Sequence, residues 1–182
     1  MRVIGGQAKG RSLRVPRGRG VRPTADRVRE TLFNWLQGEV EGSVALDLFA
    51  GSGALGIEAL SRGADHATFV ESARGAQAAL RENLALFGED PRIRVVSASA
   101  WRFLEGPAER PFDLVFLDPP FGHGWAARAA AVLEEGGWLA PEARIFLEVG
   151  GDEDPPAVPA GWRDDRRGSC GESAFHLYRR EG

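Results

Sequence analysis

An acidic residue, two prolines and an aromatic residue, Asp118-Pro119-Pro120-Phe121, directly follow an apolar segment over residues 112–117. Such a segment is typical of a central strand in an open α/β sheet, and these sheets bind ligands beyond the carboxyl ends of their strands. The two prolines restrict the backbone of the turn. The Asp118 carboxylate and the Pro119 carbonyl oxygen can then accept both N–H groups of an exocyclic amine and stabilise developing positive charge, while Phe121 can stack on a base. We interpret residues 118–121 as a site for methyl transfer to an exocyclic amine.

A glycine-rich segment follows an earlier apolar strand. Residues 47–56 read DLFAGSGALG and contain the pattern G-x-G-x-x-G. Glycines let the chain turn tightly off the strand and bring backbone N–H groups against a ligand. Glu71 lies 20 residues after Gly51, at the end of the next expected strand, where a carboxylate can accept hydrogen bonds from ribose hydroxyls. These features predict a site for an adenosine-containing cofactor, with nicotinamide dinucleotides still included.

Two features favour S-adenosylmethionine over a nicotinamide dinucleotide. Asp47 lies where the strand meets the glycine loop, and its carboxylate suits an ammonium group, directly or through water, better than a pyrophosphate. The second feature is the tetrapeptide of residues 118–121, because its chemistry needs a methyl donor. At this stage Asp47 as a simple cap of the loop, and Glu71 as a surface charge, stay open as alternatives.

Alternating apolar and amphipathic segments predict the elements that position these residues. We expect strands at residues 44–49, 67–71, 92–97, 112–118 and 143–149. Helices are expected from the glycine loop to about residue 61, over 73–87, shortly after Ala100, and over 126–135. Residues 162–167 and 174–179 are expected to form a hairpin around residues 169–171. Repeated strand–helix units that end in a hairpin predict a doubly wound α/β sheet with antiparallel strands at one edge.

The N-terminal part differs in composition. Residues 3–4 and 13–15 are expected as two short strands, and residues 17–20 as a basic loop. Thr24 is expected to cap a helix over residues 25–37, with a buried face at Val28, Leu32, Trp35 and Leu36. We therefore divide the chain into an extension, residues 1–37, and a catalytic domain, residues 38–182, within one compact unit.

The charge distribution separates the two parts. The chain of 182 residues has a formal charge of −3, yet residues 1–29 hold nine basic side chains against Asp26 alone. Lys9 is the only lysine, and arginine's planar group suits phosphates and stacks on bases. A GC-rich or thermophilic composition is the alternative reason for the chain-wide arginine bias, but the N-terminal cluster favours nucleic acid. The arginines predicted to contact RNA are Arg11, Arg14, Arg17, Arg19 and Arg22.

Other classes of protein are not indicated. Cys170 is the only cysteine, which argues against a disulfide framework and fits a reducing cytoplasm. No apolar run approaches a membrane span, and the N-terminus does not resemble a secretory signal. His66, His123 and His176 are scattered without metal-ligand spacing, so no metal site is expected.

Several segments together resemble one known family, the RsmD family. They are residues 2–6 (RVIGG), 22–36 (RPTADRVRETLFNWL) and 46–56 (LDLFAGSGALG), with the tetrapeptide 118–121 and the closing residues 177–180. The family comprises bacterial 16S rRNA guanine-N2 methyltransferases of class I, which use S-adenosylmethionine. The resemblance extends over essentially the whole chain, and the N-terminal segments separate this family from other enzymes with the same tetrapeptide.

The resemblance implies a seven-stranded Rossmann-like class I methyltransferase sheet with S-adenosylmethionine as donor. It implies N2 of guanine 966 (reference 16S numbering) as acceptor, within the 30S subunit or an assembly intermediate, and we expect a monomer. Ser99 stands where many class I enzymes have an aspartate that accepts a hydrogen bond from the adenine amine. A serine hydroxyl would replace that carboxylate, so this contact with the adenine departs from the family pattern. Carried over by motif, the cofactor residues are Phe49, Ala50, Gly51, Ser52 and Gly53 for the methionine part, Glu71 for the ribose, and Ser99 and Ala100 beside the adenine.

Three rival interpretations remain at this stage. An adenine-N6 methyltransferase acting on DNA or RNA shares the logic of the tetrapeptide. A nicotinamide-dependent reductase would use the glycine loop but leaves the Pro-Pro-Phe sequence unexplained. An RNA-binding module with a vestigial cofactor fold predicts no binding of S-adenosylmethionine.

Overall fold

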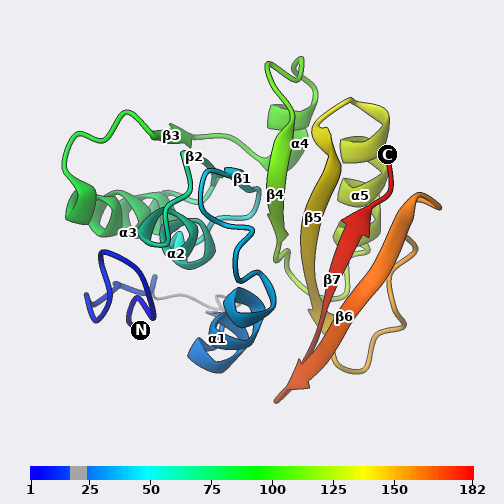
Figure 1. Ribbon diagram of the computed structural model, residues 1–182, viewed down its shortest axis with the longest axis horizontal. Coiled ribbons are helices and arrows are strands. Elements are labelled where there is room, and N and C mark those ends of the chain that lie inside the picture. The colour runs from blue at the N-terminus through cyan, green and yellow to red at the C-terminus, as the bar shows by residue number, and fades with distance from the viewer. Residues whose placement is uncertain (17–23) are drawn as a thin grey trace.

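The computed structural model describes residues 1–16 and 24–182, and it places a single mixed sheet at the centre of the molecule (Figure 1). The elements in chain order are α1 (Asp26–Trp35), β1 (Val44–Asp47), α2 (Ala54–Ser61), β2 (His66–Val70), α3 (Arg74–Leu84), the 3₁₀ helix η1 (Ala85–Phe87), β3 (Ile93–Val96), α4 (Ala100–Leu104), β4 (Phe112–Leu117), α5 (Trp125–Glu135), β5 (Leu139–Gly150), β6 (Trp162–Cys170) and β7 (Ser173–Arg180).

The seven strands lie in the order β3-β2-β1-β4-β5-β7-β6. Strands β1 to β5 pair in parallel, whereas β7 runs antiparallel to both β5 and β6. The strand order reverses between β1 and β4, and a reversal of this kind opens a crevice at the carboxyl ends of the two strands. The predicted doubly wound sheet with an antiparallel C-terminal hairpin is therefore confirmed.

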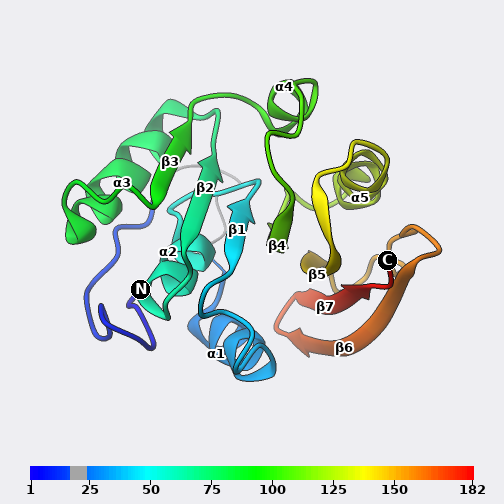
Figure 2. The same cartoon turned by 45° about the horizontal axis from the view of Figure 1, so that its top comes forward.

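Helices cover both faces of the sheet (Figure 2). Apolar side chains of α1, α2 and α3 share one core with Phe116 of β4 and Phe146 of β5. Those of α4 and α5 share the other core with the neighbouring residues Val115 and Leu147. Because successive strand residues point to opposite faces, the near-continuous apolar strands of the sequence supply both cores.

The predicted N-terminal hairpin is reduced to one bridge. Residues 3–4 and 13–15 are not strands, and only Arg2 and Ser12 form an isolated antiparallel bridge. Gly6 and Gly10 both have positive φ, +74° and +83°, so the segment bends twice, and backbone hydrogen bonds from Val3 to Arg11, from Gly10 to Val3 and from Leu13 to Met1 join its two arms without a regular strand pair. Val3 and Leu13 are nonetheless buried in the core shared with α1 and α2. The division of the chain at residue 37 stays a prediction.

The prediction that Thr24 caps α1 is wrong. The residue at the cap position is Ala25, which makes no side-chain cap hydrogen bond. Thr24 lies one residue before this cap position, and its hydroxyl instead donates to Asp118. Val28 and Leu32 of α1 and Leu36 directly after it are buried as expected, while Trp35 is half-buried against Phe175.

Other boundaries shift by a few residues. Strand β5 begins four residues earlier than expected, at Leu139, and β6 continues to Cys170. The helix expected over 73–87 divides into α3 and η1. Among the described residues, no helix has the length and apolar character needed to cross a bilayer.

Candidate cofactor and target-base site

The glycine loop joins β1 to α2 at the carboxyl edge of the sheet. Gly51 and Gly53 have φ of +55° and +82°, a left-handed region that side chains disfavour. A Cβ at Gly53 would lie 2.4 Å from Leu80 Cδ1, whereas one at Gly51 would meet nothing within 4 Å. Gly53 therefore lets the loop pack closely on α3, and Gly51 leaves open space beside the loop.

Asp47 ends β1 beneath this loop and is only 2% exposed. Its Oδ2 accepts a hydrogen bond from the backbone N–H of Gly56 at 3.0 Å. Burial raises the pKa of Asp47 to about 7, the Gly56 hydrogen bond opposes this rise, and the charge of Glu71 adds to it. The capping contact foreseen as an alternative thus exists, and a cation placed beside Asp47 would favour its ionised form.

Glu71 follows β2 and is fixed by two backbone donors. Its Oε2 accepts from the N–H of Gly51 at 2.8 Å, and its Oε1 accepts from the N–H of Ala73 at 2.9 Å. The Glu71 side chain therefore fixes the backbone of Gly51, the first glycine of the loop, which a solvent-exposed surface charge would not do. Because each carboxylate oxygen can accept more than one hydrogen bond, these contacts leave capacity for ribose hydroxyls.

Aromatic rings gather at the same edge. Phe49 lies with its ring centre 6.1 Å from those of both Trp101 and Trp125, and the two indoles are 5.7 Å apart. Trp101 is in α4 and Trp125 begins α5. Spacing in the sequence does not show that the starts of these two helices meet, so it does not assign either tryptophan to the site. The structure joins them to Phe49 of the glycine loop.

Ser99 and Ala100 lie where β3 leads into α4. The Ser99 hydroxyl accepts from the backbone N–H of Arg102 at 3.1 Å and so caps α4. Ala100 is buried in the core on the α5 side of the sheet. Ser99 therefore has a structural role in addition to any contact with an adenine.

A pocket opens beside the tetrapeptide, between the segments that follow β4 and β5. Residues 119–121 of the tetrapeptide and the start of α5 line one part of it. The rest is lined by residues at the end of β5 and in the segment after it: Glu148, Val149, Glu153, Asp154 and Pro156. Glu153 Oε1 accepts from the backbone N–H of Gly122 at 3.1 Å and of Gly150 at 3.0 Å. One carboxylate therefore ties the loop after β4 to the loop after β5.

Asp118 follows β4 directly and is partly buried beside this pocket. Its Oδ2 accepts from the Thr24 hydroxyl at 2.6 Å. Burial is the main cause that raises the pKa of Asp118 well above its ordinary value, and the charge of Glu148 adds to it. The Thr24 hydrogen bond lowers that pKa, whereas Asp47 and a hydrogen bond with Glu148 raise it. Neither Thr24 nor Glu148 was singled out from the sequence as a site residue.

The predicted RNA-contacting arginines are only partly described. Arg11 is exposed, while the Arg14 guanidinium forms an ion pair with Glu82 of α3. Arg17, Arg19 and Arg22 lie outside the described residues.

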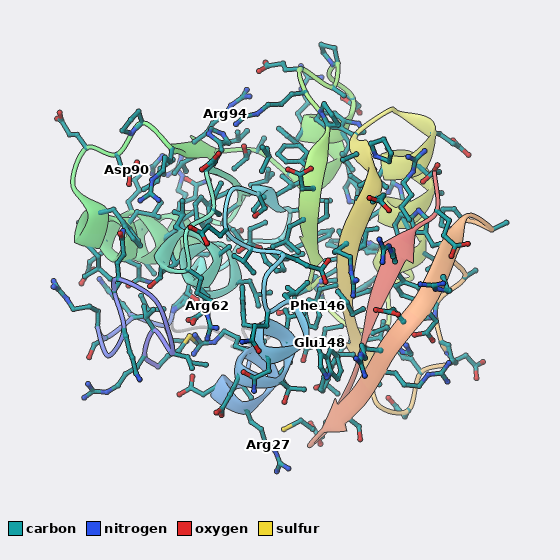
Figure 3. All side chains as sticks on the ribbon, in the orientation of Figure 1. Arg27, Arg62, Asp90, Arg94, Phe146 and Glu148 are labelled. Carbon is teal, nitrogen blue, oxygen red and sulfur yellow. The ribbon has the colours of Figure 1, made fainter. Side chains whose placement is uncertain are left out.

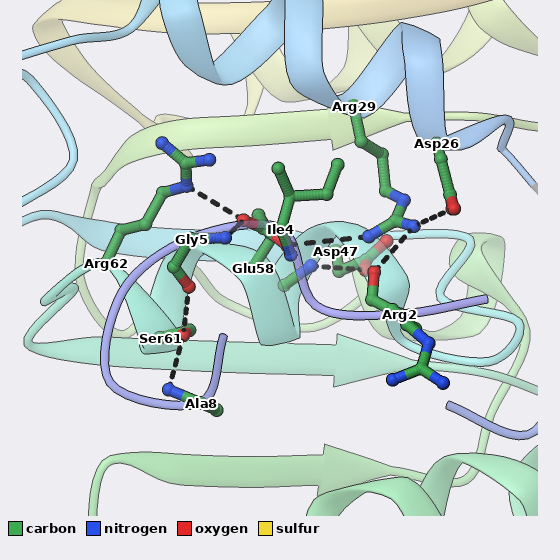
Figure 4. A network of polar contacts seen from close by, with 11 residues as sticks. Arg2, Ile4, Gly5, Ala8, Asp26, Arg29, Asp47, Glu58, Ser61 and Arg62 are labelled. Carbon is green, nitrogen blue, oxygen red and sulfur yellow. Dashed lines mark hydrogen bonds and ion pairs between the residues drawn. The ribbon is translucent and has the colours of Figure 1, made fainter. Parts of the chain in front are cut away.

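The N-terminal segment is attached to helix α2 through Glu58 (Figure 4). The fully buried Glu58 carboxylate accepts from the backbone N–H groups of Ile4 and Gly5 at 2.9 and 2.8 Å, and it pairs with Arg29 and Arg62. Arg29 is itself fully buried. Although it contributes to the basic N-terminal cluster of the sequence, its side chain serves this network and does not face a phosphate.

Comparison with known proteins shows the family. A family model described as "Conserved hypothetical protein 95" matches residues 1–179. The ribosomal RNA small subunit methyltransferase D of Escherichia coli (strain K12) is 47% identical over 181 residues, which is 100% of this chain and 90% of that protein. The enzyme of the same name from Haemophilus influenzae is 42% identical over 98% of this chain and 93% of that protein.

Solved structures agree with this similarity. A methyltransferase structure from Escherichia coli superposes with a TM-score of 0.90 at 45% identity, covering 100% of this chain and 98% of that chain. A methylase structure from Haemophilus influenzae has a TM-score of 0.85 at 39% identity, with the same coverage of both chains. The chain therefore belongs to the RsmD family of class I, S-adenosylmethionine-dependent methyltransferases.

Proposed function

We propose that this chain transfers the methyl group of S-adenosylmethionine to the exocyclic N2 of a guanine in 16S rRNA, at position 966 of the reference numbering. One observation carries the proposal: Asp47, beneath the glycine loop, ends β1, and Asp118, beside the acceptor pocket, directly follows the adjacent strand β4. A donor site and an acceptor site thus share the crevice where the strand order reverses. The relatives named as small subunit rRNA methyltransferases support the choice of substrate.

The residues of the donor side fit S-adenosylmethionine. Gly51 leaves space beside the loop, the buried Asp47 carboxyl suits the ammonium group, and Glu71 ends β2 where a ribose binds. When bound, this cofactor supplies an electrophilic methyl group. The glycine loop, Phe49 and Glu71 orient it, and the rings of Trp101 and Trp125 next to Phe49 shield this edge from water.

On the acceptor side, Asp118 and the Pro119 carbonyl accept hydrogen bonds from the target amine. An exocyclic amine is a poor nucleophile while its lone pair is delocalised into the base. Acceptors that hold its two N–H groups favour the pyramidal form and stabilise positive charge that develops on nitrogen. Phe121 provides the stacking surface for a base brought out of its helix.

The charge of the pocket favours guanine over adenine. Glu148, Glu153 and Asp154 line it beside Asp118, so the pocket is rich in hydrogen-bond acceptors. The Watson–Crick edge of guanine offers donors at both N1 and N2, whereas adenine offers a donor at N6 beside an acceptor at N1. Carboxylates match the donor pair of guanine and repel the lone pair of adenine N1.

We also propose that the substrate is the assembled 30S particle or an assembly intermediate, and that the enzyme acts as a monomer. The exposed Arg11 and the arginines at 17, 19 and 22 supply positive charge for rRNA phosphates, while the body of the enzyme is acidic. Affinity from phosphate contacts falls as salt rises.

Methyl incorporation from labelled S-adenosylmethionine into 30S particles that lack the modification tests the proposal. Naked 16S rRNA and 50S particles are assayed in parallel, and the labelled RNA is digested to nucleosides. We expect label in N2-methylguanosine from 30S particles and none from 50S particles. Label in N6-methyladenosine would instead support the rival adenine methyltransferase, and equal methylation of naked rRNA would remove the proposed need for ribosomal proteins.

A further inference from the structure

Glu148 is a buried acid within an apolar strand. Strand β5 pairs with β4 in parallel, with Leu147 opposite Leu117, so the next residue of each strand places Glu148 beside Asp118. Glu148 is 1% exposed and lines the pocket next to Pro119 and Pro120. Figure 3 shows Glu148 with Phe146 on the stretch of β5 that lies near α1. Glu148 is therefore a buried side chain at the inner wall of the pocket.

The carboxyl groups of Asp118 and Glu148 are coupled. Burial is the main cause that raises the pKa of Asp118, and the negative charge of Glu148 and a carboxyl–carboxyl hydrogen bond with it add to the rise. A hydrogen bond between two carboxyl groups requires that one of them carry a proton, because an ionised carboxylate only accepts. Two adjacent carboxylates in a low-dielectric site also resist simultaneous ionisation. The pair therefore holds a proton that an isolated Asp118 would lose.

Among the residues that the structure describes, the charges around the pair favour retention of this proton. Asp47 of β1 adds negative charge that raises the pKa of Asp118, and Glu153 and Asp154 line the same pocket. On α1 the buried cation Arg29 is bound to Glu58 and Asp26. On β7 the residue that pairs with Glu148 is the apolar Phe175, and the next residue, His176, lies 3.6 Å from Asp164.

We propose that Glu148 makes Asp118 the base that takes the proton lost by the target amine. This inference rests on the proposed function. Asp118 touches the amine, whereas Glu148 acts through Asp118 as a positioning residue, because its carboxylate accepts the hydrogen bond of the Asp118 O–H that forms. Asp118 is then a stronger base than an ordinary aspartate, and its basicity is matched to neutral pH.

The proposed reaction forms one bond to the methyl carbon and transfers one proton. The N2 lone pair forms the bond to the methyl carbon, and the carbon–sulfur bond breaks with its electron pair left on sulfur. The N2–H bond breaks with its electrons left on nitrogen, and the proton passes to the ionised Asp118 carboxylate. Asp118 then donates a hydrogen bond to Glu148, and loss of this proton to water restores the ionised form for the next turnover.

Infrared titration of the free enzyme tests the pair without any substrate. The carbonyl stretch of protonated Asp118 is assigned by its loss in Asp118→Asn, which separates it from Asp47. In the wild type we expect this band to titrate well above the ordinary range of an aspartate. In Glu148→Gln its midpoint should fall by at least about one pH unit, because the like charge is gone. An unchanged midpoint in Glu148→Gln, or an ordinary midpoint in the wild type, would overturn the proposal.

The kinetic test uses the pH profile of kcat with 30S particles. Activity needs ionised Asp118, so the acid limb of the profile should move to lower pH in Glu148→Gln, while the plateau falls roughly tenfold because the base is weaker. The KM values should stay within about twofold of the wild type, since Glu148 does not contact the donor loop. A purely structural role would lower stability or raise KM without moving the acid limb, and that result would contradict the proposal.

Two further variants complete the design. Glu148→Asp keeps a carboxylate beside Asp118 and should hold the midpoint above that of Glu148→Gln. The matched control is Glu142→Gln, the same change on the same strand at a side chain that is 77% exposed and paired with Arg179; it should leave the midpoint and kcat unchanged. If the infrared result holds but nucleoside analysis of the wild type lacks N2-methylguanosine, the proposed function fails while the coupled pair stands.

Discussion

The Thr24 hydroxyl lowers the pKa of Asp118, whereas Glu148 raises it. Removal of this hydroxyl should therefore shift the pKa in the direction opposite to removal of the Glu148 charge. In Thr24→Val the side chain keeps nearly the same shape but loses the donor that lies 2.6 Å from Asp118 Oδ2. Thr24 is 7% exposed, so water cannot readily replace the lost hydrogen bond. The substitution should therefore act on the protonation of Asp118 more than on the packing of the segment before α1.

The size of the effect follows from the charge of the acceptor. A hydrogen bond to a charged group contributes about 1.5–3 kcal/mol, and each pKa unit corresponds to about 1.4 kcal/mol. The Thr24 hydroxyl favours ionised Asp118 and lowers its pKa, so its removal should raise that pKa by roughly 1–2 units. Because activity requires the ionised form, the acid limb of kcat moves to higher pH, and well below the new midpoint the rate falls about 10- to 100-fold.

The assay is the single-turnover rate of methyl transfer to 30S particles across pH, with calorimetry of S-adenosylmethionine binding beside it. Cofactor affinity should not change, because Thr24 contacts Asp118 and not the glycine loop. The matched control is Thr31→Val, on the exposed side of α1, where the hydroxyl donates to the Arg27 carbonyl; its profile should match the wild type. An acid limb that stays in place in Thr24→Val would refute the assigned role of this contact.

Two further predictions concern buried carboxyl groups. The pKa of Asp47 rises from 3.8 to about 7 on folding, so the folded state binds the proton more tightly and the free energy of unfolding falls as pH rises through this window. Asp47→Asn should therefore stabilise the free enzyme above pH 7 by a few kcal/mol, at most roughly 4, in urea denaturation, while it weakens cofactor binding; lower stability in that range would contradict the argument. Glu58→Ala should lower the free energy of unfolding by about 3–5 kcal/mol, because it removes one of the two carboxylates paired with the buried Arg29 and the acceptor of the Ile4 and Gly5 N–H groups. The control Glu82→Ala, at a surface pair with Arg14, should lower the free energy of unfolding by less than about 1 kcal/mol. Equal losses in the two variants would show that the buried Glu58 network stabilises the fold no more than a surface ion pair does.

The fold was largely predictable because its signals are local. Alternation of apolar strands with amphipathic segments indicates a parallel sheet, and two late strands without an intervening helix indicate the terminal hairpin. The main error, the N-terminal hairpin, arose where glycine spacing decided the outcome. Gly6 packs against α2, and a Cβ there would lie 1.8 Å from the Ser61 carbonyl oxygen, which no local pattern reveals.

The site was predictable where a motif carries it and obscure where distant residues meet. The glycine loop and the tetrapeptide are contiguous in sequence, but Thr24 and Asp118 are 94 residues apart. A threonine before a helix matches the rule for a cap, so the local interpretation of Thr24 was plausible and wrong. Glu148 carried a usable signal, since a single acid within the apolar run of residues 145–149 is unusual in a buried strand.

The central claim is that Asp118 activates the acceptor while the glycine loop holds the donor separately. The most direct measurement compares Asp118→Ala with the wild type in two assays: calorimetric binding of S-adenosylmethionine and single-turnover formation of N2-methylguanosine in 30S particles. We predict unchanged cofactor affinity with turnover lower by about 10²–10³-fold, the usual loss on removal of a transition-state hydrogen-bonding partner. Wild-type turnover in Asp118→Ala, or loss of cofactor binding together with turnover, would contradict this claim.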